Sequence, residues 1–357
     1  MILVFDPYWL AKPFLHCLDP EDAHELTLRA LEANVVPWQP RGDDPVLATT
    51  LFGRALPNPV GLAAGFDKNA RVYERMGMHG FGFVEVGGVT PLPQAGNPRP
   101  RVFRLPEDGA VINRLGFPNE GASAIEARLK RKGRTDGIGL GINLASNAES
   151  ADPADDFVQL ARTFARYADY LTLDVSCPNT ANGLVFLDPV RLSNLLVRLA
   201  AVEWESARPA LVAKLSPDVD DVLLQRLVAT LLDARIDGII VANTTRARAA
   251  DLRSAHASEA GGLSGTPLFA PSTALLARVR ELSGGTVPLI GVGGIASGAD
   301  AYAKVRAGAS AVQLYTGLIY AGTGLITRIK RELAALLRRD GFASVAEAAS
   351  AVAAPAT

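Results

Sequence analysis

The sequence predicts an α/β fold, a (β/α)8 TIM barrel preceded by a pair of N-terminal helices. After residue 56, short runs rich in Val, Ile, Leu and Gly alternate with longer amphipathic stretches. These short runs are apolar throughout, which is typical of parallel strands buried on both faces. There are eight such units, and this number favours a closed barrel over an open sheet.

The expected elements follow from this alternation. We expect strands at 59–65, 81–89, 138–144, 170–176, 210–216, 238–244, 287–293 and 311–317. Helices are expected at 153–168, 189–207, 219–234, 271–282, 299–307 and 324–339, and a hairpin at 49–57. The stretches 90–118 and 245–270 are expected as long loops after the second and sixth strands, where barrels build active sites. No second domain and no repeat is indicated.

The N-terminal residues predict two helices. Apolar residues recur at helical spacing from Trp9 to Leu18, and a second helix is expected over 20–35 with Asp19 as its N-cap. The pair either packs plainly on the domain or forms an apolar hairpin that touches a membrane surface or admits a lipophilic molecule. Cys17 is expected in packing. The predicted organisation is a helical extension over 1–40, the barrel over 41–340 and a C-terminal tail over 341–357.

Composition narrows the possible functions. Lys plus Arg is 36 and Asp plus Glu is 37, so the chain lacks the basic excess of a nucleic-acid binder. Two cysteines exclude a disulfide scaffold and a metal site built from several thiolates, and no metal is expected. No apolar run reaches a membrane span and no signal peptide is visible, so a cytoplasmic chain is expected. The 33 glycines indicate tight turns or backbone close to a ligand.

Polar side chains at six of the eight expected strand ends predict a ligand site at one mouth of the barrel. Gly293 and Gly294 end the seventh strand, where backbone N–H groups can face a phosphate. Lys68 and Lys214 lie on or next to apolar strands, and a buried lysine needs an anionic partner. A flavin mononucleotide supplies such partners; an internal salt bridge is the alternative.

Cys177 is the only candidate thiol for acid–base or nucleophilic chemistry. It follows the fourth strand and precedes a proline. A free thiol titrates near about 8.5, so modest help makes it a thiolate or a general base. The alternative is a small buried apolar residue.

Together these stretches resemble the membrane-associated, quinone-linked (class 2) dihydroorotate dehydrogenases over nearly the whole chain. The most specific similarities lie at 61–68, 89–117, 243–245, 261–268 and 291–295. The resemblance implies an FMN barrel that oxidises (S)-dihydroorotate to orotate, the fourth step of de novo pyrimidine (UMP) synthesis. The substrate gives a hydride to the flavin and a proton to an enzyme base. Reduced flavin then passes electrons to ubiquinone or another membrane quinone, which enters through the N-terminal helical pair. The enzyme is expected to be held peripherally on the cytoplasmic face of the inner membrane.

The resemblance also implies site residues. Cys177 stands at the position of the base. Substrate positions are Lys68, Asn113, Arg114, Leu115, Gly116, Phe117, Asp174, Asn179, Asn243 and Thr244. Flavin positions are Ala64, Gly65, Phe66, Asp67, Lys68, Gly88, Asn143, Asp174, Lys214, Ala242, Gly265, Gly294, Tyr315 and Thr316. His24 and Arg101 match positions near the quinone; otherwise they are a helix-surface histidine and a loop arginine.

Four departures from the family pattern are visible. Cys177 replaces the Ser usual in class 2, as in the soluble class 1 relatives. Asp174 replaces an Asn that donates hydrogen bonds to flavin and substrate, and a carboxylate repels an anionic orotate. Gly88 replaces a Thr, and 181–185 has one extra residue and lacks an Arg. These changes keep open a diverged flavin oxidoreductase, a non-catalytic flavin- or nucleotide-binding protein and, from the fold alone, a phosphosugar aldolase or isomerase.

Overall fold

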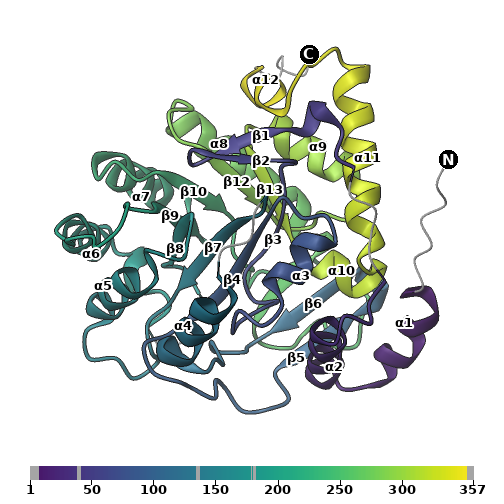
Figure 1. The fold of residues 1–357 in the computed structure, drawn as a ribbon, viewed down its shortest axis with the longest axis horizontal. Helices are drawn as coiled ribbons and strands as arrows, with labels where there is room; N and C mark the ends of the chain where they lie inside the picture. Colours follow the sequence, from purple (N-terminus) through teal and green to yellow (C-terminus); the bar gives the residue numbers. More distant parts are fainter. Residues whose placement is uncertain (1–7, 38–41, 134–136, 178, 180–181, 352–357) are drawn as a thin grey trace.

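Eight parallel strands form a closed barrel in the computed structural model, which describes residues 8–37, 42–133, 137–177, 179 and 182–351 (Figure 1). Around the barrel the order is β10-β12-β13-β3-β4-β7-β8-β9. The strands are β3 (Val60–Leu62), β4 (Phe83–Val89), β7 (Gly139–Leu144), β8 (Tyr170–Asp174), β9 (Ala210–Leu215), β10 (Gly238–Val241), β12 (Leu289–Val292) and β13 (Ala311–Leu314). Each lies within one predicted run, and the predicted fold class is confirmed.

Helices surround the barrel (Figure 1). They are α3 (Tyr73–Met78), α4 (Gly121–Lys132), α5 (Pro153–Phe164), α6 (Pro189–Ala200), α7 (Asp221–Asp233), α8 (Phe269–Leu282), α9 (Gly298–Arg306), α10 (Thr316–Ala321), α11 (Gly324–Arg339) and α12 (Val345–Ser350). Aspartates at 152 and 188 cap α5 and α6 through backbone N–H groups, and a proline follows each aspartate. The range expected as a tail contains α12, which buries Val345 and Ala348.

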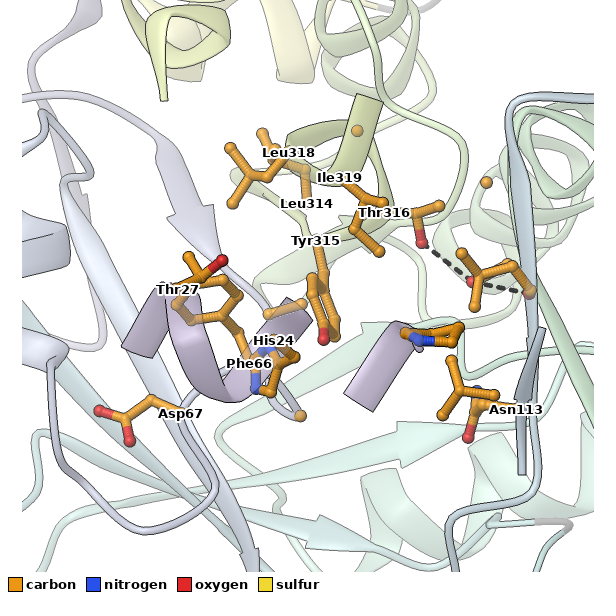
Figure 2. A pocket seen from close by; sticks show the side chains of 18 of the residues that line it. His24, Thr27, Phe66, Asp67, Asn113, Leu314, Tyr315, Thr316, Leu318 and Ile319 are labelled. Atoms are coloured by element: carbon orange, nitrogen blue, oxygen red, sulfur yellow. Dashed lines mark hydrogen bonds between the residues drawn. The ribbon is translucent and has the colours of Figure 1, made fainter. Parts of the chain in front are cut away.

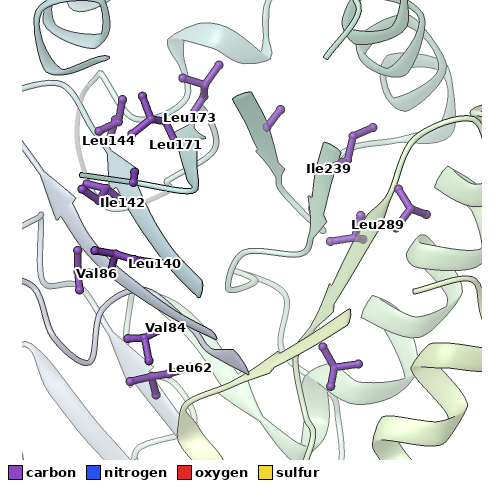
Figure 3. Close-up of a cluster of buried hydrophobic side chains, with 14 of the residues drawn as sticks. Leu62, Val84, Val86, Leu140, Ile142, Leu144, Leu171, Leu173, Ile239 and Leu289 are labelled. Atoms are coloured by element: carbon purple, nitrogen blue, oxygen red, sulfur yellow. The ribbon is translucent and has the colours of Figure 1, made fainter. Parts of the chain in front are cut away.

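Two layers of apolar side chains fix the barrel. Outward-facing strand residues such as Val84, Ile142 and Leu171 pack beneath the helices (Figure 3). A separate cluster inside the barrel contains Phe83 and Tyr170. The hairpin β1 (Thr49–Leu51) and β2 (Arg54–Leu56) adds Leu51 and Leu56 to this inner cluster. The predicted hairpin is therefore confirmed, and it closes the end of the barrel opposite the expected site.

The two stretches expected as long loops contain a small antiparallel sheet, which the sequence did not predict. Its strands are β5 (Val102–Leu105), β6 (Ala110–Asn113) and β11 (Gly262–Gly265), in the order β11-β6-β5. Phe103, Leu105, Ile112 and Leu263 form its own apolar cluster. The pairing joins β6 to β11, two segments that lie far apart in the sequence, so local sequence patterns do not reveal it.

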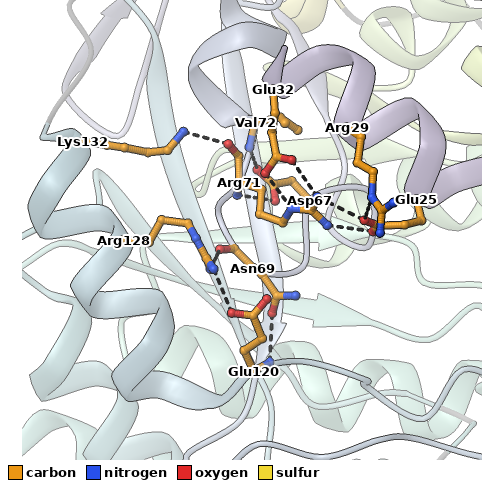
Figure 4. A network of polar contacts seen from close by, with 10 residues as sticks. All are labelled: Glu25, Arg29, Glu32, Asp67, Asn69, Arg71, Val72, Glu120, Arg128 and Lys132. Atoms are coloured by element: carbon orange, nitrogen blue, oxygen red, sulfur yellow. Dashed lines mark hydrogen bonds and ion pairs between the residues drawn. The ribbon is translucent and has the colours of Figure 1, made fainter.

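The N-terminal helices lie at the edge of the barrel, where α1 (Tyr8–Cys17) contacts α10 and α2 (Pro20–Glu32) contacts β5 (Figure 1). Asp19 caps α2 as predicted, accepting from the N–H groups of Glu21 and Asp22. Arg71 ties α2 to the barrel through Glu25 and Glu32, each at 2.7 Å (Figure 4).

Helix α1 has a different environment from α2, because none of its residues is fully buried. Trp9, Leu10 and Phe14 are 66%, 57% and 62% exposed. Cys17 is also exposed, so its expected packing role is wrong: the apolar stripe of α1 is mostly left uncovered. None of the helices in the described ranges is both long and apolar enough to cross a membrane.

Candidate active site

A cavity of about 1110 Å³ opens at the carboxyl ends of the barrel strands and continues between α1 and α2 (Figure 2). Its wall contains every predicted site residue except Arg114. Strand ends contribute polar side chains, and the two N-terminal helices contribute apolar ones such as Phe14, Leu26 and Leu28. One continuous space therefore joins the predicted substrate, flavin and quinone positions.

Two predicted site residues, Arg114 and Asp67, have their charged groups paired within the protein. Arg114 points away from the cavity, where it pairs with Glu259 at 2.8 Å and stacks on the ring of Phe103. The carboxylate of Asp67 is fully buried and accepts from the N–H groups of Arg71 and Val72 at 2.7 and 2.6 Å. Asp67 therefore holds its own loop while it also borders the cavity.

Glycines form a cradle at one end of the cavity. Gly265, Gly293 and Gly294 have φ angles of +96°, +104° and +75°, which L side chains rarely adopt. A Cβ on Gly294 would lie 2.6 Å from the backbone nitrogen of Phe269, so only glycine fits. Beside them, the hydroxyl of Thr316 donates to that of Ser264 at 2.9 Å. Backbone and hydroxyl groups here suit a phosphate.

A buried carboxylate fixes the amide of Asn143. Its Nδ2 donates to Glu85 at 3.0 Å, while Tyr170 and Gln313 donate to the other oxygen of Glu85 at 3.0 and 2.8 Å. All four residues are buried. Because a carboxylate only accepts, the Asn143 carbonyl must face the other way. That Oδ1 has no partner within the described structure, and Asn143 lines the cavity.

Asp174 lies at the end of β8 and opposite Lys214 of β9. Its Oδ1 accepts from Nδ2 of Asn243 at 3.0 Å. Burial raises the pKa of Asp174, and the negative charge of Glu85 acts in the same direction, while Lys214 opposes them. Among the described residues, no ion pair within 4.0 Å joins Asp174 to a lysine, so the raised pKa is what would reduce its repulsion of an anionic ligand.

Cys177 is buried in the cavity wall. Burial and then the charge of Asp174 raise the pKa of its thiol, so the surroundings do not favour the thiolate as the sequence suggested. Nearby, Asn179 donates to the side chain of Asn113 at 3.4 Å. Pro178, Thr180 and Ala181, which belong to the altered loop, lie outside the described residues.

Lys68 supplies a cation without an acidic partner in the described part of the chain. Its Nζ donates to the carbonyl of Gly65 at 2.7 Å, and no described carboxylate lies within 4.0 Å. Burial lowers the pKa of Lys68 to about 8. The alternative of an internal salt bridge is therefore not formed, and an anionic ligand would restore the full charge of Lys68.

His24 and Arg101 occupy the end of the cavity nearest the N-terminal helices. The His24 ring packs on Phe66 and Tyr315 with centroids 5.2 and 6.2 Å apart (Figure 2). Burial, followed by the charge of Lys68, lowers the pKa of His24 to about 3, so the ring is neutral. Arg101 is buried and pairs with Glu21 at 2.9 Å. Arg101 does lie in a loop, just before β5, and His24 lies on α2, but both side chains line the cavity.

The glycine at position 88, where the family has a Thr, lies against the side chains of Phe117 and Asn143. A Cβ there would lie 2.8 Å from the ring of Phe117 and 3.1 Å from Oδ1 of Asn143. The missing side chain therefore leaves room for the Phe117 ring, whose own φ is +52°.

Sequence reasoning missed Glu21, Glu85 and Ser264. Glu85 carried a visible signal, because it is a carboxylate inside an otherwise apolar strand. Ser264 lies within a stretch already noted for its resemblance. Glu21 gave no local signal, since its role depends on Arg101, 80 residues away.

Comparison with known proteins gives a consistent result. Residues 46–337 match the family model of dihydroorotate dehydrogenase. The chain is 50% identical over 350 residues to dihydroorotate dehydrogenase (quinone) of Rhodospirillum rubrum, covering 97% of this chain and 95% of that one. Against the Cereibacter sphaeroides protein of the same name, identity is 52% over 335 residues, covering 94% of each.

Solved structures agree with these sequence matches. A crystal structure of DHODH from Eimeria tenella in complex with ferulenol matches with a TM-score of 0.88 and 37% identity, covering 92% of this chain and 94% of that one. The ligand-free form matches with a TM-score of 0.89 and 38% identity, covering 93% and 99%.

Proposed function

The chain belongs to the quinone-dependent (class 2) dihydroorotate dehydrogenase family, and from this premise we propose that it oxidises (S)-dihydroorotate to orotate with FMN and a membrane quinone. The observation that carries the proposal is the single cavity joining the strand ends to the N-terminal helices. An enzyme with two substrates of opposite character needs a polar end and an apolar end around one cofactor. This cavity has both.

The chain's own residues fit FMN. The positive-φ glycines 265, 293 and 294 form a cradle that a Cβ would fill. The orphaned Oδ1 of Asn143 is a buried acceptor that needs a donor, and a flavin ring or its substrate offers N–H groups. We propose that Lys214 and Asn143 contact the ring and that Gly265, Gly294 and Thr316 hold the phosphate. When bound, FMN supplies the two-electron acceptor.

The polar end suits dihydroorotate. Lys68 offers a cation to a carboxylate ligand, and Asn113, Asn179, Asn243 and Thr244 offer amide and hydroxyl groups for the ring. Cys177 is the only described thiol in the wall and is placed to take the proton that leaves the substrate. Its raised pKa means that the thiol must lose a proton before it acts as a base.

The apolar end suits a quinone. His24, Phe66 and Tyr315 form a ring cluster between the barrel and α2, and Arg101 is held beside them by Glu21. The exposed Trp9, Leu10 and Phe14 of α1 support a peripheral contact with the membrane at this end. We place the protein on the cytoplasmic face of the inner membrane, where a lipophilic acceptor can reach the cavity.

Anaerobic spectroscopy tests the proposal. The purified protein should carry a yellow flavin that dihydroorotate bleaches and a ubiquinone analogue reoxidises. In Lys68→Met the flavin that is bound should be bleached far more slowly, because the substrate carboxylate loses its cation. Bound flavin that dihydroorotate leaves oxidised would contradict the proposal.

Asp174 supports a second candidate, a diverged FMN oxidoreductase acting on another substrate. A carboxyl group at this position repels an anionic orotate unless it is protonated. If dihydroorotate fails to bleach the flavin and Asp174→Asn restores bleaching, this second reading holds. If neither protein is bleached by any candidate substrate, a non-catalytic flavin protein is indicated.

A further inference from the structure

Lys304 is a buried cation that the proposed chemistry does not use. It lies on α9, is 0% exposed and does not line the cavity. Its Nζ donates to the hydroxyl of Ser272 at 2.6 Å and to the carbonyl of Val292 at 3.3 Å, and it lies 5.4 Å from the ring centre of Phe269.

Within the described ranges, no carboxylate lies within 4.0 Å of Lys304. Asp300, one turn earlier on α9, is occupied by the N–H of Ala296 and the hydroxyl of Ser297. Burial lowers the pKa of Lys304 to about 7, and the charge of Asp300 opposes this shift only in part. A buried lysine usually has a counter-charge.

The contacts of Lys304 place it behind the glycine cradle. Val292 directly precedes Gly293 and Gly294, and Ser272 also donates to the carbonyl of Gly293 at 3.4 Å. Phe269 begins α8, and its backbone nitrogen packs against Gly294. The cavity residues of this wall, at 264–268, 292–296 and 314–317, include no charged side chain. Arg328 of α11 also lines the cavity, and Lys304 adds a second, fully buried cation behind the cradle.

We propose that Lys304 is a positioning residue that supplies, through the wall, the counter-charge for a phosphate bound in the cradle. This inference rests on the proposed function, because it takes the phosphate to be that of FMN. Charge acting across a dry wall is only weakly screened, so direct contact is not required. The cradle then selects the phosphorylated flavin over one that lacks the phosphate.

The test compares FMN with riboflavin, which has the same ring and no phosphate. Flavin is removed from the full-length protein, and affinities are measured by quenching of flavin fluorescence. Lys304→Met should weaken FMN binding by about ten-fold or more while leaving riboflavin binding within about two-fold. Lys304→Gln keeps a hydrogen-bond donor for Ser272 but also lacks the charge. It should therefore change the two flavin affinities as Lys304→Met does.

Arg306→Met is the matched control, because it removes a cation from the same helix that stacks on Phe342 instead. It should change neither affinity by more than about two-fold. Equal losses of FMN and riboflavin in both Lys304 variants, or no loss of either, would overturn the inference. If the parent protein binds neither flavin, the proposed function fails instead.

Discussion

Asn143 of β7 donates its Nδ2 to a carboxylate oxygen of Glu85 on the neighbouring β4, at 3.0 Å inside the barrel. The contact orients the amide, so that its acceptor faces the cavity without a protein partner. Tyr170 and Gln313 hold the other oxygen of Glu85. A charged group beneath the site thus determines which end of Asn143 a ligand meets.

The first prediction concerns Glu85. In Glu85→Gln the new amide can accept at only one atom, so it cannot serve Asn143, Tyr170 and Gln313 together. We expect a loss of about 1–3 kcal/mol in unfolding free energy and weaker flavin retention. Chemical denaturation and flavin content of the purified protein measure these effects. Unchanged values for both would contradict an orienting role.

The second prediction concerns Asp174. Its pKa is raised, so at low pH the carboxyl is neutral and at higher pH it ionises and repels the anionic substrate. The KM for dihydroorotate should therefore rise with pH more steeply in the parent than in Asp174→Asn. At any pH where Asp174 is ionised in the parent, the variant should bind orotate about ten-fold more tightly.

Steady-state kinetics between pH 6 and about 9 check this difference. Asp156→Asn is a suitable control, because burial also raises the pKa of Asp156 but that residue lies outside the cavity wall. Parallel KM profiles for the parent and Asp174→Asn would argue against repulsion.

The third prediction concerns Cys177. A base acts in its deprotonated form, and the pKa of this thiol lies above its usual range. Flavin reduction should therefore accelerate with pH across the neutral range, without a plateau below about pH 9. In Cys177→Ser the hydroxyl is less acidic still, so the rise should move to higher pH and the rate at pH 7 should fall about 10–100-fold. Stopped-flow measurements of flavin reduction against pH check this prediction. Profiles of the parent and Cys177→Ser that superimpose would contradict the role of Cys177 as the base.

The fourth prediction separates the two half-reactions. Glu21→Gln leaves buried Arg101 without its carboxylate, at a cost of about 2–4 kcal/mol in local stability. The KM for the quinone should rise several-fold, while anaerobic bleaching by dihydroorotate keeps its rate. Asp22→Asn is the control, because it removes the neighbouring, exposed ion pair with Arg99. It should change neither the KM for the quinone nor the rate of bleaching. Slower bleaching in Glu21→Gln would contradict this prediction, because it would assign Arg101 to the reduction of the flavin by dihydroorotate.

The fifth prediction uses the neutral His24. Its folded-state pKa of about 3 lies below the unfolded value near 6.5, so the unfolded chain takes up a proton first as pH falls. Stability should decline below pH 6.5, by about 1 kcal/mol or more at pH 5, and His24→Gln should remove this part of the decline. Thermal unfolding at pH 7.5 and 5 measures it, with His256→Gln as a control.

The sequence and the structure agree where the information is local. Apolar runs located all eight barrel strands, and aspartate–proline pairs located helix starts such as that of α2. Disagreement arises where a contact joins distant segments. The direction of Arg114 depends on Glu259, and the sheet β5-β6-β11 depends on strands from two separate loops. Lys304 was overlooked because lysine is expected at the surface, although it shares a helix face with buried Ala301 and Val305.

The antiparallel pairing of β6 with β11 has a consequence for the order of folding. It brings Asn113 next to Gly262, 149 residues further along the chain. Closing so long a loop costs entropy, so we expect this pairing to form after the pairings of neighbouring barrel strands. The mouth of the site is then among the last parts of the fold to be completed.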